Sequence, residues 1–173
     1  MRKLLRNDRG VAVIELAMVA PVFAMMTIGI VDISNAYSAK LALEQGAQRA
    51  IEKIMQTTQD LPVNDTLKKE AMCQVNGHDT DEETGDETCK GGLVALDNIT
   101  VTDRLECVAV DGTMVVKTGD AASDDCEEDE EARRYKSVKV TAVYDPMFPL
   151  HFTGYDSAKT GYPISAEAGM RTQ

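Results

Sequence analysis

Two residues near the N-terminus have types and spacing that suggest chemistry: Gly10, at the end of a basic leader, and Glu15, the one charge inside an apolar run. A carboxylate at the centre of a membrane helix costs roughly 2.5 to 3.5 kcal/mol, so Glu15 is expected to serve a function or to meet a partner. Cleavage between Gly10 and Val11 would create a free ammonium group four residues before Glu15. The Glu15 carboxylate of a neighbouring copy could neutralise that ammonium in a low-dielectric assembly. The pattern predicts a processing and assembly signal.

The same two residues have a simpler interpretation. Glu15 can lie near the edge of a membrane and extend its carboxylate to the headgroups. Gly10 is then an ordinary junction residue. Local physical chemistry leaves both interpretations open.

The element that must position these residues is an apolar helix. Residues 11–31 carry no charge except Glu15, and as a helix they measure about 31 Å, enough to cross a bilayer once. Four bases and one acid precede this stretch, whereas Asp32 follows it, so the N-terminus is expected to stay in the cytoplasm. A cleaved secretory signal peptide is the competing interpretation. Its apolar region is usually shorter, and the nearest small-residue cleavage pattern, at residues 34–36, is poor.

Apolar residues return at steps of three and four after the membrane stretch, which predicts that the helix continues as an amphipathic helix. Pro62 is expected to end it, after about Gln59, because the residue before a proline is pushed out of the helical region. We therefore divide the chain into a leader (1–10), a long helix (11–61) and a head (62–173). The apolar positions of the amphipathic part are Ile33, Tyr37, Leu41, Leu43, Ala47, Ile51, Ile54 and Met55.

The head is expected to be a small antiparallel sheet preceded by a short helix, which makes the whole chain an α+β protein. A helix is predicted at 64–72, and alternating apolar residues predict strands at 99–102, 105–110, 113–116, 137–144 and 164–170. Asp111-Gly112 predicts a two-residue hairpin loop.

Four cysteines follow the membrane stretch, in the compartment that the charge flank predicts to be oxidising. Four cysteines allow three pairings, and spacing alone does not choose among them. We favour Cys73 with Cys89 and Cys107 with Cys126, because each bridge then closes a short acidic loop. Zinc is disfavoured, since no pair has the two-residue spacing of zinc ligands.

Two acid-rich segments, 78–87 and 124–131, interrupt the head and are expected to be solvated loops. The first resembles a calcium loop superficially, but an EF-hand starting at Asp79 would require glycine at Thr84 and glutamate at Lys90. No catalytic constellation, metal site or cofactor motif is recognised. The net charge of −11 also argues against nucleic acid as a partner.

Residues 9–22, Arg-Gly-Val-Ala-Val-Ile-Glu-Leu-Ala-Met-Val-Ala-Pro-Val, followed by Ile-Gly-Ile-Val-Asp at 28–32, resemble the N-terminal region of TadE-like proteins. These are pseudopilins of the Tad (Flp) type IVb pilus machinery of bacteria. The chain departs from the family pattern at Leu16, where an aromatic residue is usual. The tail, with Tyr-Asp-Pro-Met-Phe-Pro at 144–149, also resembles the family.

The resemblance implies a pilin-like minor subunit, cut by a prepilin peptidase between Gly10 and Val11, in which Glu15 serves recognition or subunit register. It implies a single-pass protein of the bacterial inner membrane with a periplasmic head, which can enter an extracellular pilus used for adhesion, biofilm formation or secretion. The implied partners are the peptidase, other pilins and pseudopilins, the inner-membrane assembly platform and the lipid bilayer. A different class remains open: an uncleaved, membrane-anchored periplasmic binding protein whose acidic head captures a ligand or Ca²⁺.

Overall fold

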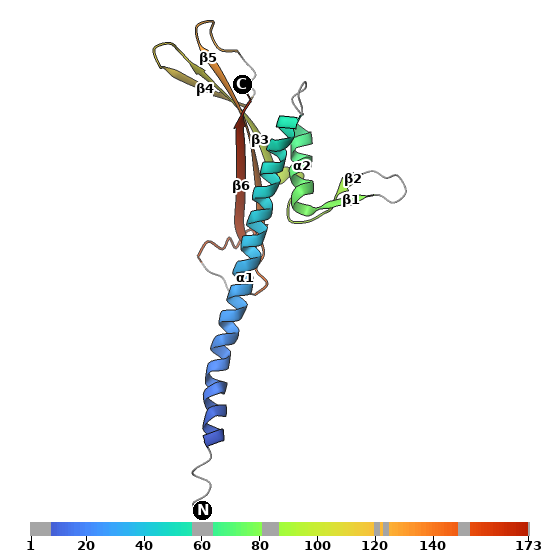
Figure 1. Cartoon of the computed structure of the whole chain (residues 1–173), viewed down its shortest axis with the longest axis vertical. Helices are drawn as coiled ribbons and strands as arrows, with labels where there is room; N and C mark the ends of the chain where they lie inside the picture. The colour runs from blue at the N-terminus through green and yellow to red at the C-terminus, as the bar shows by residue number, and fades with distance from the viewer. Residues whose placement is uncertain are drawn as a thin grey trace, which may run out of the picture.

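The structure, a computed structural model, describes residues 8–56, 64–80, 87–119, 122, 125–148 and 153–172. One long helix carries a head built from a second helix and an antiparallel sheet (Figure 1). The head packs beside the C-terminal half of the long helix, and the N-terminal half projects alone (Figure 1). The α+β class expected from the sequence is confirmed.

Helix α1 runs from Asp8 to Gln56 without interruption, including at Pro21, and is about 73 Å long at the standard rise. It starts three residues before the predicted Val11. An acid at the N-terminus favours the helix dipole, and one glycine costs a helix only about 1 kcal/mol, so neither Asp8 nor Gly10 prevents this extension. The predicted end near Gln59, before Pro62, lies outside the described residues.

The buried face of α1 begins later than the sequence pattern suggested. Leu43, Ala47 and Ile54 are buried in the head, as expected. Ile33 and Tyr37, by contrast, are exposed and do not belong to this face. Both residues precede the part of α1 that packs in the core, whose first member is Leu43, so apolar spacing alone does not bury them.

Helix α2 runs from Asn64 to Asn76, four residues beyond the predicted end at Met72. It ends at Gly77, whose φ of 91° lies in the left-handed region that glycine tolerates. The Gly77 amide donates to the Cys73 carbonyl at 2.8 Å, which satisfies one of the last carbonyl groups of the helix.

The main sheet has four antiparallel strands in the order β4-β3-β5-β6. Every strand except β3 is longer than expected, and β3 joins the two predicted segments 99–102 and 105–110 into one strand that stops at Val108. Strand β5 begins at Glu131 because its first residues pair with β3 despite their charge. A short 3₁₀ helix, Leu96–Asn98, precedes β3. The strands are β3 (Ile99–Val108), β4 (Met114–Thr118), β5 (Glu131–Tyr144) and β6 (Tyr162–Arg171).

The β3–β4 hairpin is present, but its loop is not the predicted two-residue turn. The Gly112 amide donates to the Ala109 carbonyl at 2.9 Å, and the Ala109 amide donates to the Thr113 carbonyl at 2.9 Å. The turn is therefore centred on Val110 and Asp111, and Gly112 follows it with a φ of 86°. This is the three-residue hairpin loop with a glycine bulge, which also uses an Asp-Gly pair.

The first acid-rich segment contains a structure that the sequence did not predict. Strands β1 (His78–Thr80) and β2 (Glu87–Cys89) form a small antiparallel ribbon beside α2. Its residues 81–86 lie outside the described ranges. The ribbon is short and mostly exposed, so its own packing is small, and the Cys73–Cys89 bridge ties it to α2.

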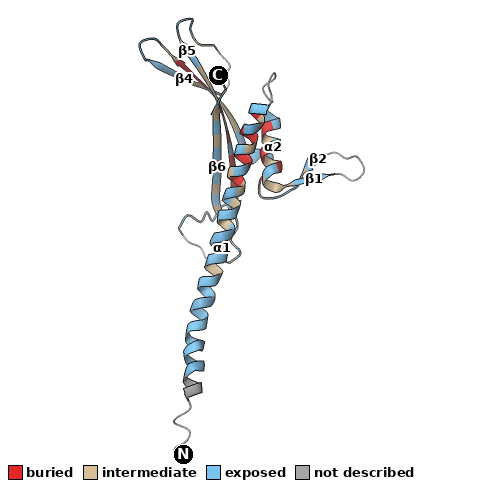
Figure 2. Cartoon of the chain, viewed as in Figure 1, coloured by how far each residue is buried: buried red, intermediate tan, exposed pale blue. Residues whose placement is uncertain are grey.

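The hydrophobic core lies between one face of the sheet and both helices. Helix α1 packs against β5 and β6, and α2 packs against α1 and β3. Figure 2 shows the buried residues concentrated in this region. The head thus shares its core with the long helix. The fully buried members include Leu43, Ala47 and Ala50 of α1, Leu67 and Ala71 of α2, and Val138 and Val140 of β5.

Candidate assembly site

The N-terminal half of α1 presents an apolar surface that nothing in the head covers. Every described side chain from residue 12 to residue 27 is exposed, and most of the projecting half of α1 is pale blue in Figure 2. Among the described helices, α1 is the one that is long and apolar enough to cross a membrane. An uncovered apolar surface of this extent requires lipid or another protein as its partner.

The predicted cleavage position lies in the first turn of this helix. Gly10 and Val11 follow the start of α1 at Asp8 by two and three residues. The first four amides of a helix have no carbonyl partner within it. Opening the backbone at this position therefore breaks few hydrogen bonds, which suits access by a protease.

Glu15 lies about one turn further along the helix than Val11. Its side chain is exposed between Ile14 and Leu16, which are 60% and 69% exposed. No hydrogen bond or ion pair joins Glu15 to another residue of the described ranges. Within these ranges, the fold isolates the carboxylate on an apolar surface and supplies it with no cation.

The helix and the head are joined where the apolar stretch ends. Asp32 accepts a hydrogen bond from the Tyr144 hydroxyl at 3.1 Å and another from the Met147 backbone amide at 3.0 Å, both at Oδ1. The Tyr144 hydroxyl also lies 3.2 Å from the Asp32 carbonyl oxygen. Burial raises the pKa of Tyr144, and the hydrogen bond to Asp32 and the charges of Asp32 and Asp145 raise it further. Tyr144 therefore stays protonated, as a donor to Asp32 must.

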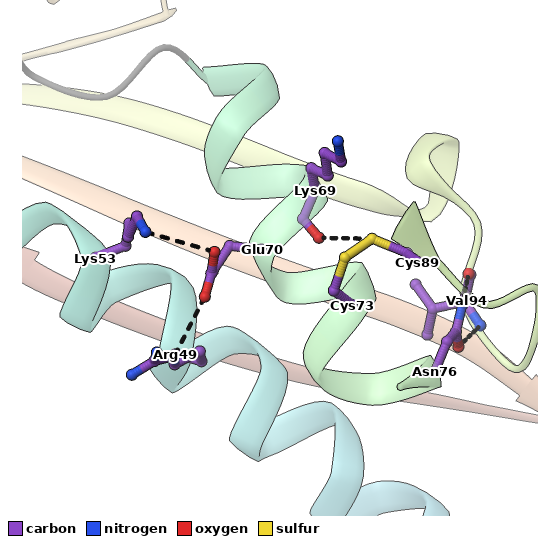
Figure 3. Close-up of a disulfide and its surroundings, with 8 residues drawn as sticks. All are labelled: Arg49, Lys53, Lys69, Glu70, Cys73, Asn76, Cys89 and Val94. Atoms are coloured by element: carbon purple, nitrogen blue, oxygen red, sulfur yellow. Dashed lines mark hydrogen bonds and ion pairs between the residues drawn. A yellow bond between two sulfur atoms is a disulfide. The ribbon is translucent and has the colours of Figure 1, made fainter. Parts of the chain in front are cut away.

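A second junction fixes α2 to α1 higher in the head. Gly46 allows the helices to approach: a Cβ at this position would lie 2.5 Å from Val75 Cγ2 and 2.9 Å from the Ala71 carbonyl oxygen. Glu70 of α2 bridges Arg49 at 3.2 Å and Lys53 at 3.9 Å on the facing side of α1 (Figure 3). The close approach at Gly46 and the ion pairs of Glu70 together hold the C-terminal part of α1 against α2 in the head.

Both disulfides have the pairing favoured from the sequence. Cys73–Cys89 connects α2 to β2 (Figure 3), and Cys107–Cys126 connects β3 to the segment before β5. Cys107 is buried with Leu105 and Ala122 in a small second core. These bridges are the means by which the acidic connections are held to the sheet and to α2.

The described residues offer one group of converging potential metal ligands, Cys107, Cys126 and Glu130. The two sulfur atoms of this group are joined in a disulfide, so they provide no thiolates for a metal. The part of the first acid-rich segment that resembles a calcium loop lies largely outside the described residues.

Comparison with known protein families finds a match within α1. Residues 10–51 match the family described as TadE-like protein. The N-terminal helix is TadE-like. The match begins at Gly10, includes Glu15 and Asp32, and extends into the part of α1 that packs in the head. The match supports a component associated with a Tad pilus system.

The matched segment ends before α2, so the sheet and both disulfides are outside the TadE-like region. No curated protein and no solved structure matches the chain. The resemblance proposed from residues 9–32 is confirmed and extends to residue 51.

Sequence reasoning placed Val11 and Glu15 on one helix and left Gly10 in the leader, whereas the structure has all three on α1. It missed the contact between Asp32 and the segment after β5, which are more than a hundred residues apart in the chain. The available signals were Asp32 as the first acid after the span and the Tyr-Asp-Pro-Met-Phe-Pro motif. Neither reveals by itself that the two meet.

Proposed function

We propose that this protein is a pilin-like (pseudopilin) subunit of a Tad pilus machinery. A prepilin peptidase removes residues 1–10, and the helix then holds the protein in the inner membrane before it joins an assembly. The single observation that carries this proposal is the isolated Glu15 on an exposed apolar helix within a TadE-like segment. The continuous α1 connects that segment rigidly to the head.

Charge compensation explains why cleavage and assembly belong together. Before cleavage Glu15 has no cationic partner in the described chain. Cleavage after Gly10 places an ammonium group on Val11. In a bundle of parallel helices, the Val11 ammonium of one subunit meets the Glu15 carboxylate of its neighbour when the helices are offset by about one turn. Such pairing sets the register of subunits, because a displaced neighbour leaves both charges unpaired in an apolar environment.

Orientation follows from the leader and the cysteines. The basic residues before the span keep the N-terminus in the cytoplasm, which places the head on the periplasmic side. Two disulfides in the head suit that oxidising compartment. The partners we propose are the prepilin peptidase, other pilins and pseudopilins, and the inner-membrane assembly platform. Adhesion, biofilm formation or secretion would then be functions of the assembled pilus.

The first test is the N-terminus of the protein isolated from its native membranes, determined by sequencing and intact mass. We expect a chain that starts at Val11, and a chain that starts at Met1 when Gly10→Val is introduced. Gly29→Val is the matched control, because no described residue comes within 4 Å of a Cβ at Gly29 and processing should be unchanged. A wild-type start at Met1 would contradict the proposal and favour the uncleaved, membrane-anchored binding protein.

The second test separates processing from assembly. Glu15→Gln removes the charge and keeps the size, so we expect a processed subunit that no longer co-purifies with the other pilus components. Met18→Ala is the control on the same exposed surface, since Met18 is uncharged and 74% exposed. Normal assembly of the Glu15→Gln protein would remove Glu15 from the mechanism.

A further inference from the structure

The connection between β5 and β6 lies at the end of the sheet nearest the membrane half of α1. Tyr144, the last residue of β5, pairs with Tyr162, the first residue of β6, so the connection leaves and returns at this end. In Figure 1 its described parts lie beside α1 below the sheet, at the opposite end of the head from the β3–β4 hairpin. The described parts of this connection are residues 145–148 and 153–161.

Asp32 fixes the start of this connection to the helix. Its carboxylate accepts the Met147 backbone amide at 3.0 Å and the Tyr144 hydroxyl at 3.1 Å. The Asn35 side-chain amide lies 3.4 Å from Met147 Sδ, on the next turn of the helix. The level of Met147 along the helix axis is thus set by α1 itself.

That level coincides with the boundary of the hydrocarbon region. Asp32 directly follows Val31, the last residue of an apolar stretch of about 31 Å, which matches the roughly 30 Å of bilayer hydrocarbon. Asn35 is three residues further, or about 4.5 Å along the axis. The interfacial layer on each side of a bilayer is about 5 to 7 Å thick. Met147 therefore lies within it when α1 spans the membrane.

The side chain at this level is apolar and uncovered. Met147 is 68% exposed, although Asp32 accepts a hydrogen bond from its backbone amide and the Asn35 side-chain amide lies 3.4 Å from its sulfur atom. A single exposed methionine is ordinary on a protein surface facing water. At the membrane interface, insertion of such a side chain removes apolar surface from water and is favourable.

The surrounding residues indicate which type of contact is involved. Tyr155 and Tyr162 form an edge-to-face pair with ring centroids 5.5 Å apart at the same end of the sheet, and tyrosine is enriched at membrane interfaces. The charged side chains in the described parts of the connection include Asp145 and the half-buried Asp156 as acids and Lys159 as a base. Because acids outnumber bases, attraction to anionic headgroups does not drive this contact, and apolar insertion does.

We propose that the described start of the β5–β6 connection, residues 145–148, is a second membrane contact of the head: Met147 inserts into the periplasmic interface of the bilayer that α1 spans, and Asp32 holds it at that depth. The inference rests on the proposed function insofar as α1 must lie in a bilayer. Two contacts, helix and loop, then restrict rotation and tilt of the head relative to the membrane surface before assembly.

The chain contains no tryptophan, so single tryptophans report on position without background. Full-length Met147→Trp is placed in phosphatidylcholine nanodiscs whose acyl chains are brominated close to the headgroup. We expect blue-shifted emission and a loss of fluorescence of about twofold or more, as suits an indole at the interface. Val110→Trp, at the far hairpin and 92% exposed, is the negative control and should not be quenched. Met25→Trp, within the span and 71% exposed, is the positive control for lipid contact, read with bromines deeper in the chain.

The outcomes separate the two proposals. Quenching of Met25→Trp without quenching of Met147→Trp overturns the loop contact and leaves the membrane helix intact. Absence of quenching at both positions overturns the membrane placement and the loop contact together. In the Met147→Trp protein, Asp32→Ala should reduce the quenching, whereas Asp32→Asn keeps the Oδ1 acceptor and should preserve it. Equal quenching in the Asp32→Ala protein overturns the role of Asp32.

Discussion

Leu41 and Leu43 lie two residues apart on α1, and the structure gives them opposite environments. Leu43 is fully buried in the core, whereas Leu41 is 40% exposed. Leu43→Ala and Leu41→Ala remove the same atoms from the same helix with the same change in helix propensity. The difference between the two variants therefore measures the packing of α1 against the head.

The expected magnitudes follow from burial. Complete burial of a leucine side chain contributes roughly 1.5 to 3 kcal/mol, and an unfilled cavity raises the cost of truncation to about 2 to 5 kcal/mol. Leu43→Ala should lower the free energy of unfolding by that amount. Leu41→Ala leaves no internal cavity and loses only part of the transfer term, so we expect about 1 kcal/mol or less.

Thermal unfolding of the head in detergent micelles measures this difference, with tyrosine fluorescence as the probe, since the chain has five tyrosines and no tryptophan. For a domain of this size about 4 °C corresponds to 1 kcal/mol, so Leu43→Ala should lower Tm by roughly 8 to 20 °C. The disulfides stay oxidised in both variants, which keeps the unfolded reference the same.

Equal shifts for the two variants would refute the assignment of the buried face. A larger shift for Leu41→Ala would mean that the head packs against the side of α1 that carries Tyr37 and Leu41. The sequence pattern included both leucines, so the experiment decides between them directly.

Two further perturbations test the ion pairs of Glu131 on the sheet and the contact between α1 and α2. The carboxylate of Glu131 is hydrogen-bonded by Arg133 and Arg171, which lowers its pKa to about 2. The stability that the ionised Glu131 contributes should therefore be present above pH 4.5 and disappear as the pH falls toward 2. NMR titration of the Glu131 carboxyl should show a midpoint well below 4.5. A midpoint near 4.5 would refute the network of Glu131 with the two arginines. Gly46→Val would place side-chain atoms against Val75, and we expect overpacking to cost about 1 to 3 kcal/mol in thermal unfolding; unchanged stability would show that the α1–α2 contact is looser than the structure indicates.

The long helix was predictable because its signals are local. Hydrophobicity over 11–31, the basic leader and the spacing of Leu43, Ala47 and Ile54 each act over a few turns of one segment. The main strands were located for the same reason, since alternation is a short-range pattern. The lengths of β5 and β6 were not, because pairing with a neighbour extends a strand into residues whose own pattern is polar, as at Glu131.

The candidate site divides in the same way. Gly10, Val11 and Glu15 are one stretch of sequence, and their relation needs only the periodicity of a helix. The contact of Asp32 with Tyr144 and Met147 depends on where the sheet packs along α1, which no local pattern encodes. The favoured pairing of the cysteines rested on the closure of short loops, and the structure has that pairing.

The sequence by itself determined that the chain has a TadE-like apolar helix with one carboxylate inside it, because composition and spacing along a single segment are sufficient for that. Only the tertiary structure decided which side of the helix the head covers and which side stays open. It also decided that Asp32 links the end of the membrane stretch to the β5–β6 connection. The physical reason is that burial and hydrogen bonding between distant segments depend on how whole elements pack, and a packing register of helix on sheet is fixed by many small contacts at once.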